Sequence, residues 1–176
     1  MSTFKGHGVL AMIANVLLAI WPLLALFSYK FFLAISNPIV ATIALLYFSA
    51  IFPHPTYLFF EIKHLLFKDG IADDLDLEAI VVFGGLSLLG LGIQVATNVL
   101  VIQLLPAQLS RPYMALALSF LASLGACLGL TDLVWLHILW PPKVLEHISI
   151  FIKNKGLVPL CLGTTVLLAF LTMIFI

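Results

Sequence analysis

The sequence predicts an all-α, polytopic membrane protein with about five transmembrane helices and two interfacial amphipathic helices. Of the 176 residues, 63% are hydrophobic and 9% are charged, whereas soluble domains are roughly half apolar and one-quarter charged. The mean hydropathy is +1.22. The apolar residues also form long runs, and about 20 such residues allow a helix to cross a hydrocarbon core of about 30 Å.

Five runs are long enough to span the bilayer, and together they form one predicted helical-bundle domain, residues 1–176. Prolines lie at most of the proposed ends, as expected for residues that interrupt helices. Pro22 should bend the first span, and Asn37-Pro38 predicts that residues 31–37 are an interfacial turn or a kinked first segment. The predicted spans cover about residues 9–29, 31–52, 78–105, 113–135 and 156–176.

Two of the polar connections have apolar residues on one face at helical spacing. Residues 56–68 and 143–153 both show this pattern, which is typical of amphipathic helices lying at a membrane surface. The acidic residues of 69–78 favour an exposed loop. A divalent cation site is the alternative, but the loop lacks the central glycine of a calcium site, so we predict no metal there.

The basic residues predict the orientation, because they accumulate on the cytoplasmic side of short loops. If the chain crosses the membrane five times, six lysines lie on one side of the membrane, and Lys30 and Arg111 lie on the other. The N terminus is therefore expected in the cytoplasm and the C terminus outside. A cleaved signal peptide is the competing interpretation of the first span, and its long apolar run favours retention as a helix. The six lysines are Lys5, Lys63, Lys68, Lys143, Lys153 and Lys155.

Strongly polar side chains inside the spans are costly and need a reason. Asn15 lies in the first span, and Gln94 and Asn98 lie in the third, four residues apart on one helix face. Hydrogen bonds between helices are the first interpretation of these amides. A polar path for a substrate is the alternative.

An interfacial cluster of acids and histidines is the second candidate site. Asp132 lies near the inner end of the fourth span, and we expect Glu61 and His64 to face it or His137 at the same membrane depth. Independent extension of each side chain into cytoplasmic water is the alternative. Such a cluster could supply an acid, a base or metal ligands to a membrane enzyme, although no reaction follows from it.

Several functions find no support in the sequence. Zero net charge gives no basic surface for nucleic acid. The five histidines and two cysteines lack the spacings of zinc or di-iron sites, so we predict neither a metal nor a cofactor and leave open whether the histidines bind a metal or pigment. No nucleophile elbow or phosphate-binding loop occurs.

Small residues predict where helices approach closely. Ala115, Ser119, Ser123 and Cys127 recur every four positions in the fourth span, and glycines are frequent in the third. We therefore expect these two helices to form the centre of the bundle.

Three segments carry a resemblance to a known family. They are residues 15–22, residues 52–65 and the glycine pair Gly125 and Gly129. In order and pattern they resemble a bacterial membrane family known as domain of unknown function 1361. The resemblance places Pro53, Pro55, Tyr57, Glu61 and His64 on that family's second motif. It implies a multi-spanning protein of the bacterial inner membrane and supplies no activity.

The first functional hypothesis is a membrane protein without catalysis, acting as an accessory or assembly subunit of a larger membrane complex. A small transporter with a polar path through the first, third and fourth helices is the alternative. A membrane-embedded enzyme is the third. The expected partners are the lipid bilayer and other membrane subunits.

Overall fold

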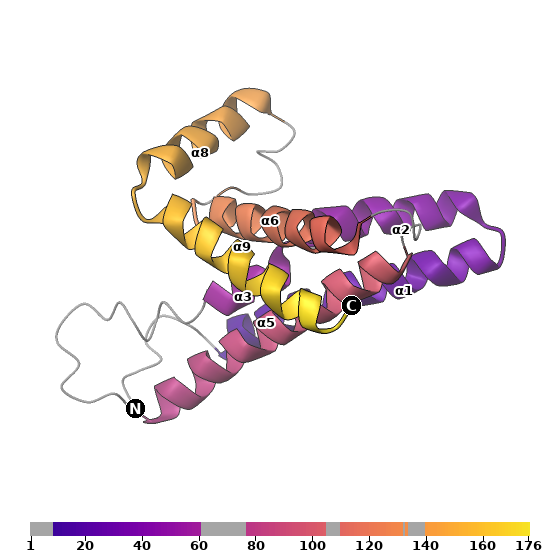
Figure 1. Ribbon diagram of the computed structural model, residues 1–176, viewed down its shortest axis with the longest axis horizontal. Helices are drawn as coiled ribbons and strands as arrows, with labels where there is room; N and C mark the ends of the chain where they lie inside the picture. Colours follow the sequence, from indigo (N-terminus) through magenta and orange to yellow (C-terminus); the bar gives the residue numbers. More distant parts are fainter. Residues whose placement is uncertain (1–8, 61–76, 105–109, 132, 134–139) are drawn as a thin grey trace. The chain divides into compact units, whose positions relative to one another are not determined.

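Helices make up all regular structure in the part of the chain that the structure describes (Figure 1). This computed structural model describes residues 9–60, 77–104, 110–131, 133 and 140–176. No strand occurs in these ranges. The elements are α1 (Val9–Ala34), α2 (Pro38–Ile51), α3 (His54–Phe59), α5 (Leu77–Leu104), α6 (Arg111–Gly129), α8 (Pro141–Lys153) and α9 (Leu157–Ile174).

Five helical segments are long and apolar enough to cross a membrane, which confirms the predicted all-α class with about five transmembrane helices. The second of these segments, Pro38–Phe59, includes both α2 and α3. The third and fifth agree closely with the spans expected from the sequence. No more than 39% of the most apolar window of any segment is buried in this chain, which leaves apolar surface on every segment for lipid or other proteins to cover. The segments are Ile13–Ala34, Pro38–Phe59, Ile80–Leu104, Arg111–Gly129 and Leu157–Ile174.

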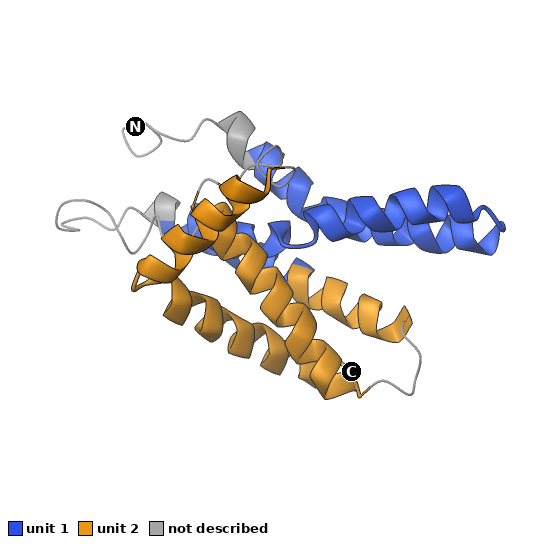
Figure 2. Cartoon of the chain, turned by 90° about the horizontal axis from the view of Figure 1, so that it is seen from above, with its two compact units in different colours: residues 1–93 blue, residues 94–176 orange. Residues whose placement is uncertain are grey.

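The chain divides into two compact units, residues 1–93 and 94–176 (Figure 2). The boundary falls within α5, so each unit contains one part of this helix. Unit 1 has α1, α2, α3 and the first part of α5, and unit 2 has the remainder of α5 with α6, α8 and α9.

In unit 1, α1 and α2 form a closely packed helical hairpin. Their connection bends at Ser36, which has a φ of 56°. Asn37 then caps α2, because its side-chain oxygen accepts a hydrogen bond from the Val40 N–H at 3.3 Å.

The predicted boundary between the first two spans is wrong. We expected the second span to begin at residue 31, whereas α1 continues to Ala34 and α2 begins at Pro38. Lys30 does not end the first helix, because lysine is a good helix former and its long side chain reaches water from inside a membrane. The proline at 38 sets the limit, since it disfavours helical geometry at Asn37.

The second span is interrupted near its end. Its first part, α2, ends at Ile51, and α3 begins two residues later with Pro55 in its first turn. We expected residues 56–68 to begin an interfacial amphipathic helix. In its described portion, residues 56–59 follow α2 within one apolar segment, and Thr56 and Leu58 are fully buried, so an interfacial helix is not confirmed there. Residues 61–68 lie outside the described residues.

Packing between α3 and α5 depends on Gly90. A Cβ atom at this position would lie 2.5 Å from the Pro55 carbonyl oxygen and 2.7 Å from the Phe59 nitrogen. Both distances are too short for any side chain, so only glycine permits the two backbones to approach this closely. Gly84 and Gly85, one to two turns earlier, have open space at the same position.

In unit 2, α6 and α9 pack closely against each other. Arg111 at the start of α6 donates from Nη1 to the Ile176 carbonyl oxygen at 3.0 Å, so the two helices run antiparallel. The small-residue face expected in the fourth span is buried as predicted. The end predicted at residue 135 is wrong, because α6 stops at Gly129 and a turn follows.

The turn is held by Thr131, whose N–H and hydroxyl both donate to the Leu128 carbonyl oxygen at 3.0 and 2.7 Å. In a continuing α-helix the Leu128 carbonyl oxygen would accept the N–H four residues later, and the two Thr131 bonds satisfy it in place of that N–H. Farther along, residues 143–153 are helical as part of α8. Placement of α8 at a membrane surface stays a prediction.

Candidate functional site

A buried network of side-chain hydrogen bonds joins three helices of unit 2. Gln94 Nε2 donates to Asn98 Oδ1 at 3.1 Å, within α5. Asn98 Nδ2 in turn donates to Ser119 Oγ of α6 and to Thr172 Oγ1 of α9, each at 3.2 Å. All four side chains are 0% exposed. The network is therefore fully buried, and all four of its members belong to unit 2.

Local helix geometry explains how the network forms. Gln94 and Asn98 are four residues apart, so both amides lie on one face of α5. The amide of Asn98 has two N–H hydrogens, one for each of the two hydroxyl groups that it contacts. Ser119 belongs to the small-residue face of α6, which lets the helices come close enough for these bonds. Asn98 is thus the centre of the network.

Additional hydroxyl and thiol groups are buried along the α6 and α9 faces. Thr165 Oγ1 donates to the Cys161 carbonyl oxygen of its own helix at 2.7 Å. Cys127 and Cys161 are free thiols. Ser123 Oγ is buried and bonds to no described group. No group of three metal-ligating side chains occurs in the described residues. This composition provides hydrogen bonds and no acid, base or metal-ligand set.

Ser119 and Ser123 provide a matched test of the network, because they lie one turn apart on the same face of α6. Ser119→Ala should lower the free energy of unfolding by about 1 kcal/mol, since one Asn98 hydrogen loses its acceptor. Ser123→Ala should raise it by about 1 kcal/mol, since a buried hydroxyl without a described partner is removed. Unfolding in mixed micelles measures both. Equal effects of the two variants would contradict the assignment.

The structure brings together only part of the expected polar path. Gln94 and Asn98 bond to each other, as their spacing permits. The other two partners of Asn98 are hydroxyls: Ser119, which was predicted only as a packing residue, and Thr172, which was not singled out. Asn15 is half-buried and belongs to unit 1, whereas the network belongs to unit 2.

The expected interfacial cluster lies outside the described residues. All four of its members, Glu61, His64, Asp132 and His137, fall in the ranges 61–76, 132 and 134–139. Their predicted proximity therefore stays a prediction.

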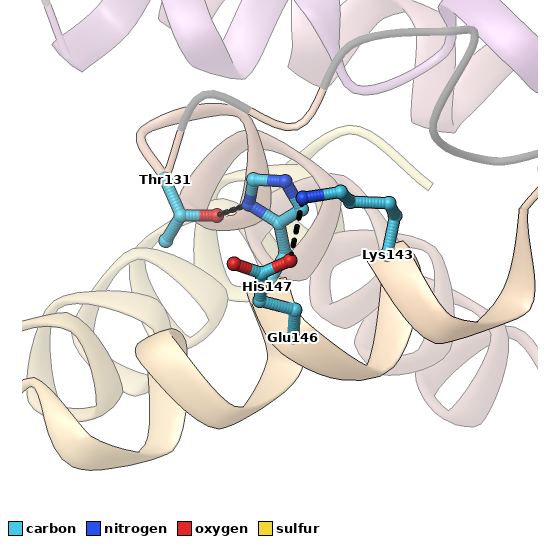
Figure 3. Close-up of polar contacts among 4 residues, drawn as sticks. All are labelled: Thr131, Lys143, Glu146 and His147. Carbon is cyan, nitrogen blue, oxygen red and sulfur yellow. Dashed lines mark hydrogen bonds and ion pairs between the residues drawn. The ribbon is translucent and has the colours of Figure 1, made fainter.

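A second polar contact fixes α8 to the end of α6 (Figure 3). Thr131 Oγ1 lies 3.1 Å from His147 Nδ1, and the histidine side chain is only 7% exposed. The Thr131 hydroxyl also donates to the Leu128 carbonyl oxygen, so it lies between that carbonyl and the His147 imidazole. Lys143 and Glu146 form an exposed ion pair at 2.8 Å on the same helix.

This contact corrects the predicted faces of residues 143–153. Helical periodicity predicts a polar face that carries Lys143, Glu146 and His147. The structure instead buries His147 against Thr131. The helical periodicity does not distinguish a histidine in water from one bonded to a neighbouring helix. No sequence signal singled out Thr131.

Removing the Thr131 hydroxyl should destabilise the packing of α8 against the end of α6. Thr131→Val removes the oxygen that contacts His147 Nδ1, so we expect the free energy of unfolding to fall by about 1 to 2 kcal/mol and amide hydrogen exchange across α8 to become faster. Lys143→Met is the control, because an exposed ion pair contributes little. Unchanged exchange in Thr131→Val would show that the contact does not hold the helix.

Comparison of the chain with protein-family models, with curated proteins and with solved structures gives no match. The geometry of the described residues is therefore the basis for the functional argument.

Proposed function

We propose that this protein is a non-catalytic integral membrane protein that acts as an accessory or assembly subunit of a larger membrane complex. The Asn98 side chain carries the proposal, because it is 0% exposed and uses both amide hydrogens to join α6 and α9 to α5. A polar group used in this way stabilises helix packing and presents nothing to a substrate. A transport path would instead require that amide to face an accessible cavity.

The exposed apolar surface also supports an assembly role. Between 22% and 39% of the most apolar window of each span is buried in this chain. The remaining faces meet lipid or other membrane helices. Val81 and Leu88 of α5 are examples, with exposed fractions of 64% and 71%.

Native mass spectrometry after purification in a mild detergent tests the assembly proposal. We expect the intact 19.3 kDa chain within a larger particle that contains another membrane protein at fixed stoichiometry. A particle that contains only one copy of this chain, in several detergents and in lipid nanodiscs, would contradict it.

The double variant Gln94→Leu and Asn98→Leu tests the transport alternative. Loss of a measured flux with unchanged yield and stability would support transport.

We further propose that the protein resides in a bacterial inner membrane with the N terminus in the cytoplasm and the C terminus outside. The lysine distribution and the resemblance to domain of unknown function 1361 support this placement. A reporter fused after Ile176 should be active only on the outer side, and one inserted near Asp74 only in the cytoplasm. Activity of both reporters on the same side would contradict the orientation.

A further inference from the structure

The interruption of the second span contains a histidine that none of the functions above uses. His54 is the first residue of α3, between Pro53 and Pro55, and it lies within the membrane-spanning segment Pro38–Phe59. If the segment rises about 1.5 Å per residue, His54 lies about five residues, or roughly 8 Å, from its Phe59 end. An ionisable side chain inside a span indicates a functional site.

The imidazole of His54 is positioned by stacking and leaves one nitrogen unsatisfied. Its ring stacks on that of Tyr57, with centroids 5.9 Å apart and planes at 28°. The Nε2 atom is buried, and no described residue forms a hydrogen bond with it. Leaving a polar atom unpaired in an apolar interior costs about 1 to 3 kcal/mol, so buried polar atoms in proteins nearly always have a partner.

The backbone at the interruption is also rich in acceptors. Prolines 53 and 55 have no N–H, so the carbonyl groups four residues earlier, at Ser49 and Ile51, lose their α-helical donors. Irregular backbone at membrane depth is tolerated where other groups satisfy it. The interruption therefore combines an imidazole nitrogen with carbonyl oxygens inside an apolar segment.

The side chains that the structure describes in unit 1 favour a neutral ligand over an ion. Among the side chains that the structure describes in unit 1, Lys30 alone is charged. It belongs to α1, and the whole of α2 separates it from His54 in the sequence. A cation or an anion beside His54 would thus lack a compensating charge from those side chains. A hydroxyl group satisfies either imidazole tautomer, because it both donates and accepts.

We propose that the interruption at His54 is a binding site for a neutral hydroxyl group, supplied by a water molecule or by the head of a membrane amphiphile. The hydroxyl forms a hydrogen bond with Nε2, and its second bonding position is directed to a backbone carbonyl freed by the prolines. The site is independent of the Asn98 network, which belongs to unit 2.

Nitrogen-15 NMR of histidine-labelled full-length protein tests the proposal in dodecylphosphocholine, a detergent that has no hydroxyl group. The His54 signals are assigned by their loss in His54→Gln and, independently, in His54→Phe. If water is the ligand, Nε2 should already show the chemical shift of a hydrogen-bonded nitrogen. If an amphiphile is the ligand, Nε2 should show a non-bonded shift that moves saturably when decanol is added. A non-bonded shift with and without decanol would overturn the proposal.

Stability provides a second readout. With an occupied site, His54→Phe should lower the midpoint of thermal unfolding, and His54→Gln should restore it in part, because glutamine retains a donor and an acceptor. With nothing bound, His54→Phe should raise the midpoint, since it removes an unsatisfied atom and retains an aromatic ring beside Tyr57. A raised midpoint in His54→Phe would therefore overturn the proposal.

Discussion

Replacing Gly90 with alanine is expected to destabilise the protein by about 3 kcal/mol. The new Cβ would meet the Pro55 carbonyl oxygen at 2.5 Å and the Phe59 nitrogen at 2.7 Å. Both contacts are with backbone, which cannot rotate away as a flexible side chain can. The helices α3 and α5 must then separate, and the apolar packing between them is lost.

Gly84→Ala and Gly85→Ala are the matched controls, because they make the same chemical change on the same helix with nothing within 4 Å of the new atom. Alanine favours a helix over glycine by about 1 kcal/mol, so both controls should be neutral or stabilising. Unfolding in mixed micelles, followed by circular dichroism, measures all three variants. Similar stability of Gly90→Ala and the controls would show that α3 does not pack on α5 as described.

Replacing Asn98 with leucine is expected to lower the free energy of unfolding by about 2 kcal/mol. The substitution removes three hydrogen bonds and leaves buried hydroxyls on two other helices. A hydrogen bond between membrane helices contributes on the order of 1 kcal/mol, and the greater hydrophobicity of leucine offsets part of the loss. Gln103→Leu is the control, because Gln103 is an exposed amide on the same helix. A variant Asn98→Leu that is as stable as this control would contradict a packing role for the network.

The sequence predicts the fold class well because composition and long apolar runs reflect the solvent around the chain. The third and fifth spans are long and free of internal breaks, so their limits follow from hydropathy. The limits at residues 29–31 and 135 are wrong for local reasons. Lys30 is compatible with a membrane helix, and the turn after Gly129 depends on hydrogen bonds of Thr131 that hydropathy does not reflect.

The candidate site was predictable only within one helix. The spacing of Gln94 and Asn98 predicts their mutual hydrogen bond, because helical geometry fixes residues four apart. Thr172 is 74 residues from Asn98, and periodicity does not indicate which face of another helix will approach. The second span was predicted to end at residue 52, whereas the apolar helical segment in the structure continues through His54 to Phe59.

The turn between α1 and α2 has a consequence for biosynthesis. Its polar backbone groups bond locally: the Asn37 N–H donates to the Phe32 carbonyl at 2.9 Å, and the Asn37 side chain caps α2. The hairpin thus needs no later segment of the chain to close its loop. During synthesis, these two helices can enter the bilayer together as a preformed pair, before α5 has left the ribosome. Nascent chains that end just after α2 should therefore already resist extraction from the membrane.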